Sequence, residues 1–80
     1  MSVMIYTTNH CPFCHMAKEY FKKHDVKYME INVEEDPEAA EEMIEKSGQM
    51  GVPVIEIDGT IIVGFNRPAI ERALEKSKNK

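Results

Sequence analysis

Residues 3–21 read VMIYTTNHCPFCHMAKEYF, and they place a pair of cysteines between a strand pattern and a helix pattern. The opening run, residues 3–6, is continuously apolar with a β-branched and aromatic bias, which is typical of a central strand covered on both faces. From Pro12 onward apolar side chains recur every three or four residues, which indicates an amphipathic helix with proline in its first turn. The fold is therefore expected to begin as a strand, a cysteine-bearing loop and a helix.

A second strand and a second helix are predicted next. Residues 28–33 alternate between apolar and polar side chains, which favours a strand at an edge of the sheet. Asp36 before Pro37 is typical of a helix start, and Ser47-Gly48 is typical of a stop. Within this helix we expect Met43 and Ile44 to face the core.

The C-terminal part predicts a hairpin followed by a last helix. Residues 54–57 and 60–63 are apolar, β-branched runs joined by Asp58-Gly59, a dipeptide that favours a tight type I′ turn between antiparallel strands. Residues 68–76 place apolar side chains on one side and predict a helix, with residues 76–80 fraying into solvent. The order β-α-β-α-β-β-α predicts an α/β fold, a mixed four-stranded sheet flanked by three helices.

Composition limits the class of protein. A chain of 80 residues with 42% hydrophobic and 30% charged residues has the size and make-up of one globular domain, which we place at residues 1–80. Ten basic against fourteen acidic residues give a net charge of −4, so nucleic acid is not expected as a partner. The longest apolar opening is too short for a membrane span or a signal peptide, so a cytoplasmic protein that does not bind membranes is expected.

The two cysteines, Cys11 and Cys14, are spaced for redox chemistry. At a helix start, unpaired backbone amides and the helix dipole favour an anion, so the thiolate of Cys11 should form near neutral pH. Cys14, one turn inside the helix, should be more buried and able to attack a mixed disulfide on Cys11. Pro12 donates no backbone hydrogen bond, and Phe13 offers an apolar face beside the nucleophile. Two inert buried cysteines are the alternative.

Three motifs together resemble the glutaredoxin superfamily: Cys11-Pro12-Phe13-Cys14 after a strand, Gly51-Val52-Pro53-Val54 before a hairpin, and Gly64-Phe65 ahead of the last helix. The resemblance extends over nearly the whole chain. His15 after the cysteine motif, the Gly64-Phe65 pair and the short length look most like the NrdH-redoxin branch of glutaredoxin-like proteins.

This resemblance implies a thioredoxin fold and a dithiol oxidoreductase that reduces protein disulfides through Cys11 and Cys14. It implies a cis Val52–Pro53 bond facing the cysteines, with the Val52 backbone pairing with the partner's chain. It further implies electrons from a thioredoxin-reductase-like enzyme and ribonucleotide reductase as one target. We expect a monomer with no cofactor beyond the redox-active disulfide and no metal, and a partner surface that includes Thr8, His10, Gly64 and Phe65.

The chain departs from the glutathione-using members of the family at two places. Those members carry a lysine ahead of the motif, and a Gly-Gly pair with a following aspartate before the last helix. Here the matching positions hold Thr8 and then Gly64-Phe65-Asn66-Arg67. Two charge-assisted contacts to glutathione are thereby lost, so weak glutathione binding is expected. The NrdH branch usually has Arg-Pro directly after Gly-Phe, whereas Asn66 is inserted here.

Several alternatives use the same residues. A glutathione-dependent glutaredoxin is one. A metal or iron-sulfur cluster carrier is a second, because His10, Cys11, Cys14 and His15 have suitable donor atoms and a second chain could complete the site. The sequence from Cys11 to His15 also satisfies the C-x-x-C-H pattern of haem attachment. The imidazole of His10 either stabilises the thiolate or simply faces water. Seven acidic residues within residues 34–45 form a solvated helix face or steer a basic partner.

Overall fold

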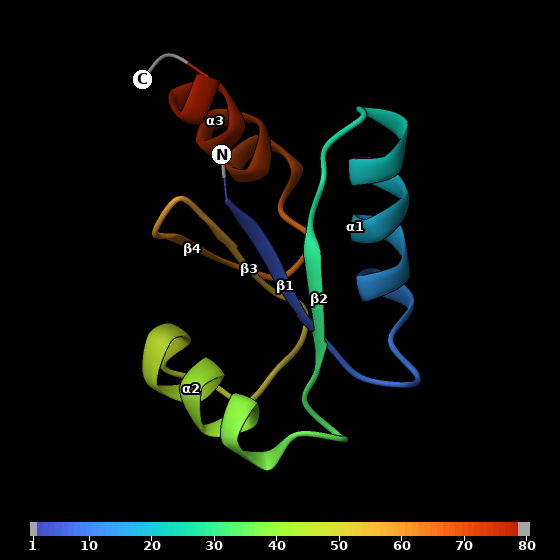
Figure 1. The fold of residues 1–80 in the computed structure, drawn as a ribbon, viewed down its shortest axis with the longest axis vertical. Helices are drawn as coiled ribbons and strands as arrows, with labels where there is room; N and C mark the ends of the chain where they lie inside the picture. The colour runs from blue at the N-terminus through green and yellow to red at the C-terminus, as the bar shows by residue number, and fades with distance from the viewer. Residues whose placement is uncertain (1, 79–80) are drawn as a thin grey trace.

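The computed structural model describes residues 2–78 and contains seven elements in the predicted order (Figure 1). The elements are β1 (Val3–Thr7), α1 (Pro12–Lys23), β2 (Met29–Asn32), α2 (Pro37–Ser47), β3 (Val54–Ile57), β4 (Thr60–Val63) and α3 (Arg67–Lys78). The prediction for the two hairpin strands agrees with the structure at every boundary. The thioredoxin-type β-α-β-α-β-β-α order is confirmed.

One mixed sheet of four strands has the order β2-β1-β3-β4. Strand β1 pairs in parallel with β2 and antiparallel with β3, and β3 pairs antiparallel with β4. The prediction of a central first strand and an edge second strand is therefore confirmed. Asp58 and Gly59 both have positive φ angles, 46° and 89°, as the type I′ turn between β3 and β4 requires.

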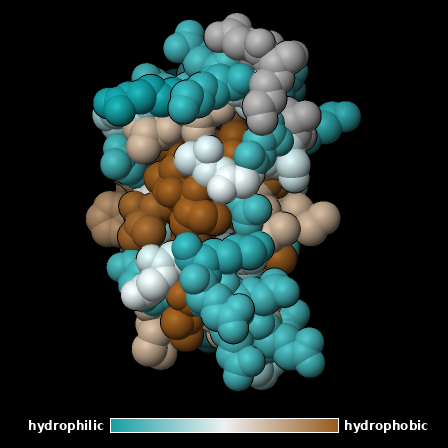
Figure 2. All heavy atoms as spheres, turned by 90° about the vertical axis from the view of Figure 1, so that its left-hand side faces the viewer, coloured by the Kyte–Doolittle hydropathy of each residue, from teal (hydrophilic) through white to brown (hydrophobic). Residues whose placement is uncertain are grey.

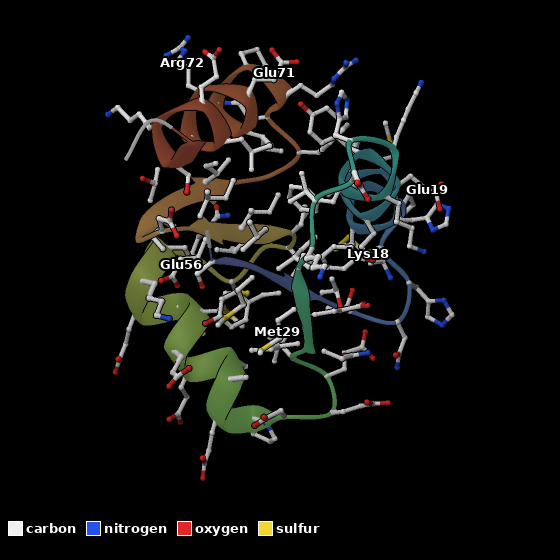
Figure 3. The ribbon with its side chains drawn as sticks, turned by 45° about the horizontal axis from the view of Figure 1, so that its top comes forward. Lys18, Glu19, Met29, Glu56, Glu71 and Arg72 are labelled. Atoms are coloured by element: carbon white, nitrogen blue, oxygen red, sulfur yellow. A yellow bond between two sulfur atoms is a disulfide. The ribbon has the colours of Figure 1, made fainter. Side chains whose placement is uncertain are left out.

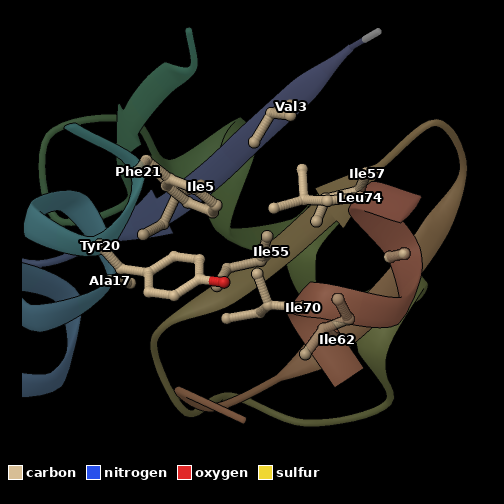
Figure 4. Close-up of a cluster of buried hydrophobic side chains, with 11 residues drawn as sticks. Val3, Ile5, Ala17, Tyr20, Phe21, Ile55, Ile57, Ile62, Ile70 and Leu74 are labelled. Carbon is tan, nitrogen blue, oxygen red and sulfur yellow. The ribbon is translucent and has the colours of Figure 1, made fainter. Parts of the chain in front are cut away.

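Helices α1 and α3 cover one face of the sheet and enclose the larger core. Buried side chains of β1, β3 and β4 pack there against both helices, and Figure 4 shows Phe21 beside Ile5, with Ile55 next to Ile70. The core comprises Val3, Ile5, Ala17, Tyr20, Phe21, Ile55, Ile57, Ile62, Ile70, Ala73 and Leu74. Because this core contacts the helix that carries the cysteines, it fixes the position of the cysteine motif on the sheet.

Helix α2 covers the opposite face with a smaller core around Tyr6 and Met43. The Tyr6 ring is fully buried in this core. Lys46 donates to the Tyr6 hydroxyl at 3.2 Å and to a Glu56 carboxylate oxygen at 2.9 Å. The hydrogen bond to Glu56, followed by the one to Tyr6, raises the pKa of Lys46. These contacts join α2 to the two central strands.

The ends of α2 follow from its capping residues, but one of its core assignments was wrong. The Asp36 side chain accepts a hydrogen bond from the Ala39 amide at 3.2 Å, and Gly48 ends the helix in the left-handed region at φ 76°. Met43 is 2% exposed, as expected, whereas Ile44 is 36% exposed. The side chain of Ile44 lies outside the narrow stripe through which this short helix contacts the sheet.

Helix α3 is longer than predicted at both ends. It begins at Arg67 because Asn66 caps it, accepting from the Ala69 amide at 3.3 Å through its side chain. It continues to Lys78, so the prediction that the chain frays from residue 76 is wrong for residues 76–78, and residues 79–80 lie outside the described part. The Ser77 hydroxyl donates to the Asp58 carboxylate in the hairpin turn, which anchors the last turn of the helix.

The surface on the side of β4 carries a band of hydrophobic side chains between polar regions (Figure 2). Val63 of β4 and Ile44 of α2 are exposed by 44% and 36%. No helix within residues 2–78 has the length and apolar character needed to cross a membrane.

Candidate active site

Cys11 and Cys14 are joined by a disulfide at the start of α1, with their Cα atoms 5.2 Å apart. Cys11 is the N-cap residue of α1, with extended backbone angles, and Pro12 occupies the first turn. The Cys14 amide points at the Cys11 Sγ atom at a distance of 3.1 Å. The first turn of this helix holds no acidic residue, so its free amides and dipole are available to stabilise a negative charge on the sulfur of Cys11.

The two sulfur-bearing residues differ in exposure. Cys11 is half-buried at the surface, whereas Cys14 is 2% exposed. Pro12 is exposed as well, and Phe13 projects from the helix start with 59% of its surface exposed. A sulfur atom of another molecule can therefore approach Cys11 from solvent, past an apolar ring, while Cys14 lies behind it. This is the difference in exposure that the sequence predicts.

The sheet brings a second segment to the same place. Val54 pairs with Tyr6 across β1 and β3, so the antiparallel register carries Pro53 to the end of β1, at Thr7. The Gly64 amide donates to the Pro53 carbonyl at 2.8 Å and extends the β3–β4 pairing in the same direction. Pro53 is buried, and the Val52–Pro53 peptide bond is cis, as the resemblance implies.

The expected partner-surface residues differ in how much they project. His10 is exposed, and Thr8 and Gly64 are half-buried. Phe65 is also half-buried, because its ring packs edge-on against Tyr20 with the ring centroids 6.1 Å apart. Phe65 therefore closes the space between α1 and α3 and presents only part of its ring to a partner.

The two methionines that flank the site in sequence are strongly exposed. Met16 follows the cysteine motif on α1 and is 46% exposed, and Met50 precedes the proline segment and is 79% exposed. Phe13 and Met16 together expose apolar side chains on the first turns of α1, next to the disulfide. Such side chains favour contact with the apolar part of a protein partner.

A polar brace behind the cysteine loop was missed in the sequence. The Asn9 backbone and side-chain amides donate to the two carboxylate oxygens of Glu34 at 3.1 and 3.2 Å. The Asn32 side-chain amide donates to the Asn9 Oδ1 atom at 2.6 Å. Glu34 belongs to the acidic stretch that we interpreted as solvated or as steering a partner. The parallel pairing of Thr7 with Asn32 brings these residues together, and only that register could have revealed the contact.

A second polar contact ties α1 to β2. Glu30 accepts from the Lys18 ammonium at 3.0 Å and from the Thr7 hydroxyl at 2.9 Å. The hydrogen bond from Lys18 is the largest effect on this carboxyl group and lowers its pKa. Figure 3 shows Lys18 and Glu19 on α1 as neighbours in sequence that point in different directions. The contact from Lys18 holds the helix that carries the cysteines to β2 at the edge of the sheet, and the contact from Thr7 joins β1 to the same strand.

The histidines that flank the cysteine pair do not form a metal-ligand cluster with it in the described part of the chain. Within residues 2–78 no group of three or more His, Cys, Asp or Glu side chains is arranged to hold a metal ion. His10 and His15 are both exposed on the surface, and His15 lies 3.9 Å from the Glu19 carboxylate. The arrangement present in one chain is a cysteine pair suited to thiol-disulfide exchange.

Comparisons with known proteins agree with this geometry. The glutaredoxin family model matches residues 3–62. A glutaredoxin-like 8.6 kDa protein in the rubredoxin operon of Clostridium pasteurianum is 47% identical, over 92% of this chain and 99% of the relative. The glutaredoxin-like protein NrdH of Lactococcus lactis subsp. cremoris is 39% identical, over 84% of this chain and 90% of the relative.

A solved structure supports the same assignment. The NrdH-redoxin from Escherichia coli superimposes with a TM-score of 0.81 at 33% identity, over 90% of this chain and 93% of that one. Fold and cysteine pair together define a thiol-disulfide oxidoreductase with a thioredoxin fold. The chain belongs to the glutaredoxin family, and its likeness to the NrdH redoxins of that family is confirmed.

Proposed function

We propose that this protein is a small dithiol redoxin that reduces disulfides in partner proteins, with Cys11 as the nucleophile and Cys14 as the resolving thiol. The observation that carries the proposal is the half-buried Cys11 at an open helix start, its sulfur facing the Cys14 amide, with the Cys14 side chain buried behind it. The arrangement favours the thiolate at the one sulfur that a substrate can reach.

Reduction of a substrate disulfide takes place in two thiol-disulfide exchanges. The Cys11 thiolate attacks one sulfur of the substrate disulfide, forms a mixed disulfide and releases the first substrate thiolate, which takes a proton from water. The Cys14 thiol then gives its proton to water, attacks the Cys11 Sγ atom as the thiolate and releases the second substrate thiolate, which is protonated in turn. The substrate gains two electrons and two protons, and the redoxin ends with the Cys11–Cys14 disulfide that the structure contains. No cofactor enters either step.

The other site residues are proposed to hold the substrate. The Val52 backbone, beside the buried Pro53, lies at the end of the sheet from which the cysteine loop starts and is available to pair with an extended substrate chain. Phe13, Thr8, His10, Gly64 and the exposed part of Phe65 supply the surrounding contact surface. We further propose a cytoplasmic monomer consisting of one domain, residues 1–80.

We propose a thioredoxin-reductase-type flavoenzyme as electron donor and ribonucleotide reductase as one target. The solved NrdH-redoxin is described as having a thioredoxin-like activity profile, which supports this choice. At the position where glutathione-using members carry an aspartate, Arg67 places its guanidinium 5.6 Å from the Tyr20 ring. A cation there repels the ammonium group of glutathione instead of pairing with it, and Thr8 supplies no charge for the glycyl carboxylate.

The donor preference gives a testable prediction. Two missing charge-assisted contacts, at about 1.5–3 kcal/mol each, should weaken glutathione binding at least about tenfold. In steady-state assays of NADPH oxidation with a model protein disulfide, we expect a thioredoxin reductase to sustain turnover at least about tenfold faster than glutathione with its reductase.

The control is a variant that restores the two charges. Thr8→Lys combined with Arg67→Asp should raise the glutathione-driven rate, and Cys11→Ser measures the background. Equal or faster turnover of the unaltered protein with glutathione would make it a glutathione-dependent glutaredoxin. Adding an oxidised ribonucleotide reductase as the terminal acceptor then tests the proposed target. If that enzyme is not reduced, ribonucleotide reductase is excluded as a target.

A further inference from the structure

A groove that the redox chemistry does not use runs along α1 from the cysteine motif toward the end of the helix. It encloses a volume of about 620 Å³ between the outer face of α1 and the segment that leads into α3. Its apolar lining comes from Met16, Tyr20 and Phe65, and the Tyr20 ring is 8% exposed. Burial, followed by the nearby Glu71 carboxylate, raises the pKa of the Tyr20 hydroxyl, so this ring stays neutral.

The charged side chains that line this groove are mostly basic. Lys22, Lys23 and Arg67 contribute positive charges, and Glu19 is the carboxylate among the lining residues. Two imidazoles, those of His15 and His24, add further hydrogen-bond donors to the lining. This local excess of positive charge stands against a net charge of −4 for the whole chain.

Negative charge is gathered elsewhere on the molecule. Seven acidic residues fall within residues 34–45, in and just before α2, and α2 lies on the opposite face of the sheet from α1 and α3 (Figure 1). Nearer to the groove, Glu71 and Glu75 line a separate hollow beyond Tyr20 and His24, at the far end from the disulfide. An acidic chain that enters from the disulfide side passes Glu19 and then meets Lys22 and Lys23 before it reaches Glu71 and Glu75.

The groove is continuous with the site of disulfide exchange. Met16 follows Cys14 by two residues on the same helix, and Phe65 follows Gly64, whose amide is bonded to Pro53. From Cys14 to Lys23 the helix rises about 13 Å, at about 1.5 Å per residue. About four residues of extended chain span that length, so residues close to a substrate cysteine can reach the lysines.

We propose that this groove binds an acidic segment of the protein substrate, located within about four residues of the cysteine that Cys11 attacks. The carboxylates of the segment pair with Lys22, Lys23 and Arg67, and an apolar side chain between them packs on Tyr20 and Phe65. The proposal rests on the proposed function and names its substrate class: disulfides with acidic flanking sequence. Matching charge at the rim of an interface acts mainly on the rate of association and on specificity.

The test compares two synthetic peptides that contain the same disulfide. One carries four flanking residues with Asp and Glu around a single Leu, and the other has Asn and Gln in place of the acids. Reduced protein is mixed rapidly with each peptide, and the second-order rate constant is measured, so no donor enzyme is needed. We expect the acidic peptide to react about five- to tenfold faster at low salt, with the ratio falling toward one as salt is added.

Two double variants with the same change in net charge localise the effect. Lys22→Gln with Lys23→Gln should bring the acidic-to-neutral ratio close to one. Lys27→Gln with Lys76→Gln, at exposed positions outside the groove, should leave the ratio unchanged. Glu19→Gln should raise it. Equal rates for the two peptides, or the same loss of selectivity in both double variants, would overturn the proposal.

A binding measurement tests the groove proposal independently of the proposed redox function. If neither peptide is reduced, the proposed redox function is contradicted. The acidic peptide with its cysteines replaced by serine is then titrated into the protein, and NMR shifts are followed. Shifts concentrated at Lys22, Lys23 and Phe65 would support the groove, whereas no shifts, or shifts confined to other surfaces, would overturn it.

Discussion

Serine in place of Cys11 is expected to lower the rate of disulfide reduction about a thousandfold or more, because a hydroxyl at this position neither ionises near neutral pH nor forms a mixed disulfide. The helix start favours a negative charge on this one sulfur, and Cys14 is too buried to take over the first attack. Insulin or a small aromatic disulfide, with dithiothreitol-reduced protein in single turnover, provides the measurement.

The matched control is serine at the other cysteine. Cys14→Ser keeps the nucleophile and its amide hydrogen bond, so its first attack on a disulfide should proceed near the normal rate while catalytic turnover stops. The reverse pattern, with Cys11→Ala keeping half of the activity and Cys14→Ala losing the first attack, would show that the roles of the two cysteines are exchanged.

The largest effect on stability is expected for Phe21→Ala. Phe21 is fully buried in the core between α1 and the sheet, with its ring centroid 5.6 Å from that of Tyr28. Removing such a ring costs about 3–5 kcal/mol, and domains unfold at a total cost of only about 5–15 kcal/mol. The variant should lose much of its stability in urea unfolding followed by circular dichroism.

Phe13→Ala is the control for that measurement. It deletes the same side chain at a position where 59% of the surface is exposed, so the free energy of unfolding should change by less than about 1 kcal/mol. Equal losses in the two variants would contradict the assignment of Phe21 to the core and of Phe13 to the surface. Because Phe13 lies beside the disulfide, its variant should instead weaken reduction of protein substrates.

The sequence predicted most accurately the elements whose boundaries are marked by strong local signals. Asp58-Gly59 fixes the hairpin because both residues adopt positive φ angles. Asp36 and Gly48 set the two ends of α2 because they cap its first and last turns. The C-terminal end of α3 could not be predicted from such local signals. Its last turn is held by the bond from Ser77 to Asp58, which are 19 residues apart and meet only in the folded chain.

The same distinction applies to the active site. The cysteine pair could be recognised because a strand, two cysteines and a helix are contiguous in sequence. The brace from Asn9 to Glu34 depends on the register between β1 and β2, which the alternation of residues 28–33 does not set. The basic groove depends on Arg67 and Phe65 packing against Tyr20 of α1, a contact between segments more than forty residues apart.

The most direct test of a Cys11 nucleophile and a Cys14 resolving thiol is to isolate the covalent intermediate. Reduced Cys14→Ser protein is mixed with a protein disulfide, quenched in acid, and analysed by mass spectrometry with peptide mapping. We expect one substrate molecule per redoxin, attached at Cys11 and released by dithiothreitol. No adduct with Cys14→Ser, together with a stable adduct at Cys14 in the Cys11→Ser protein, would contradict it.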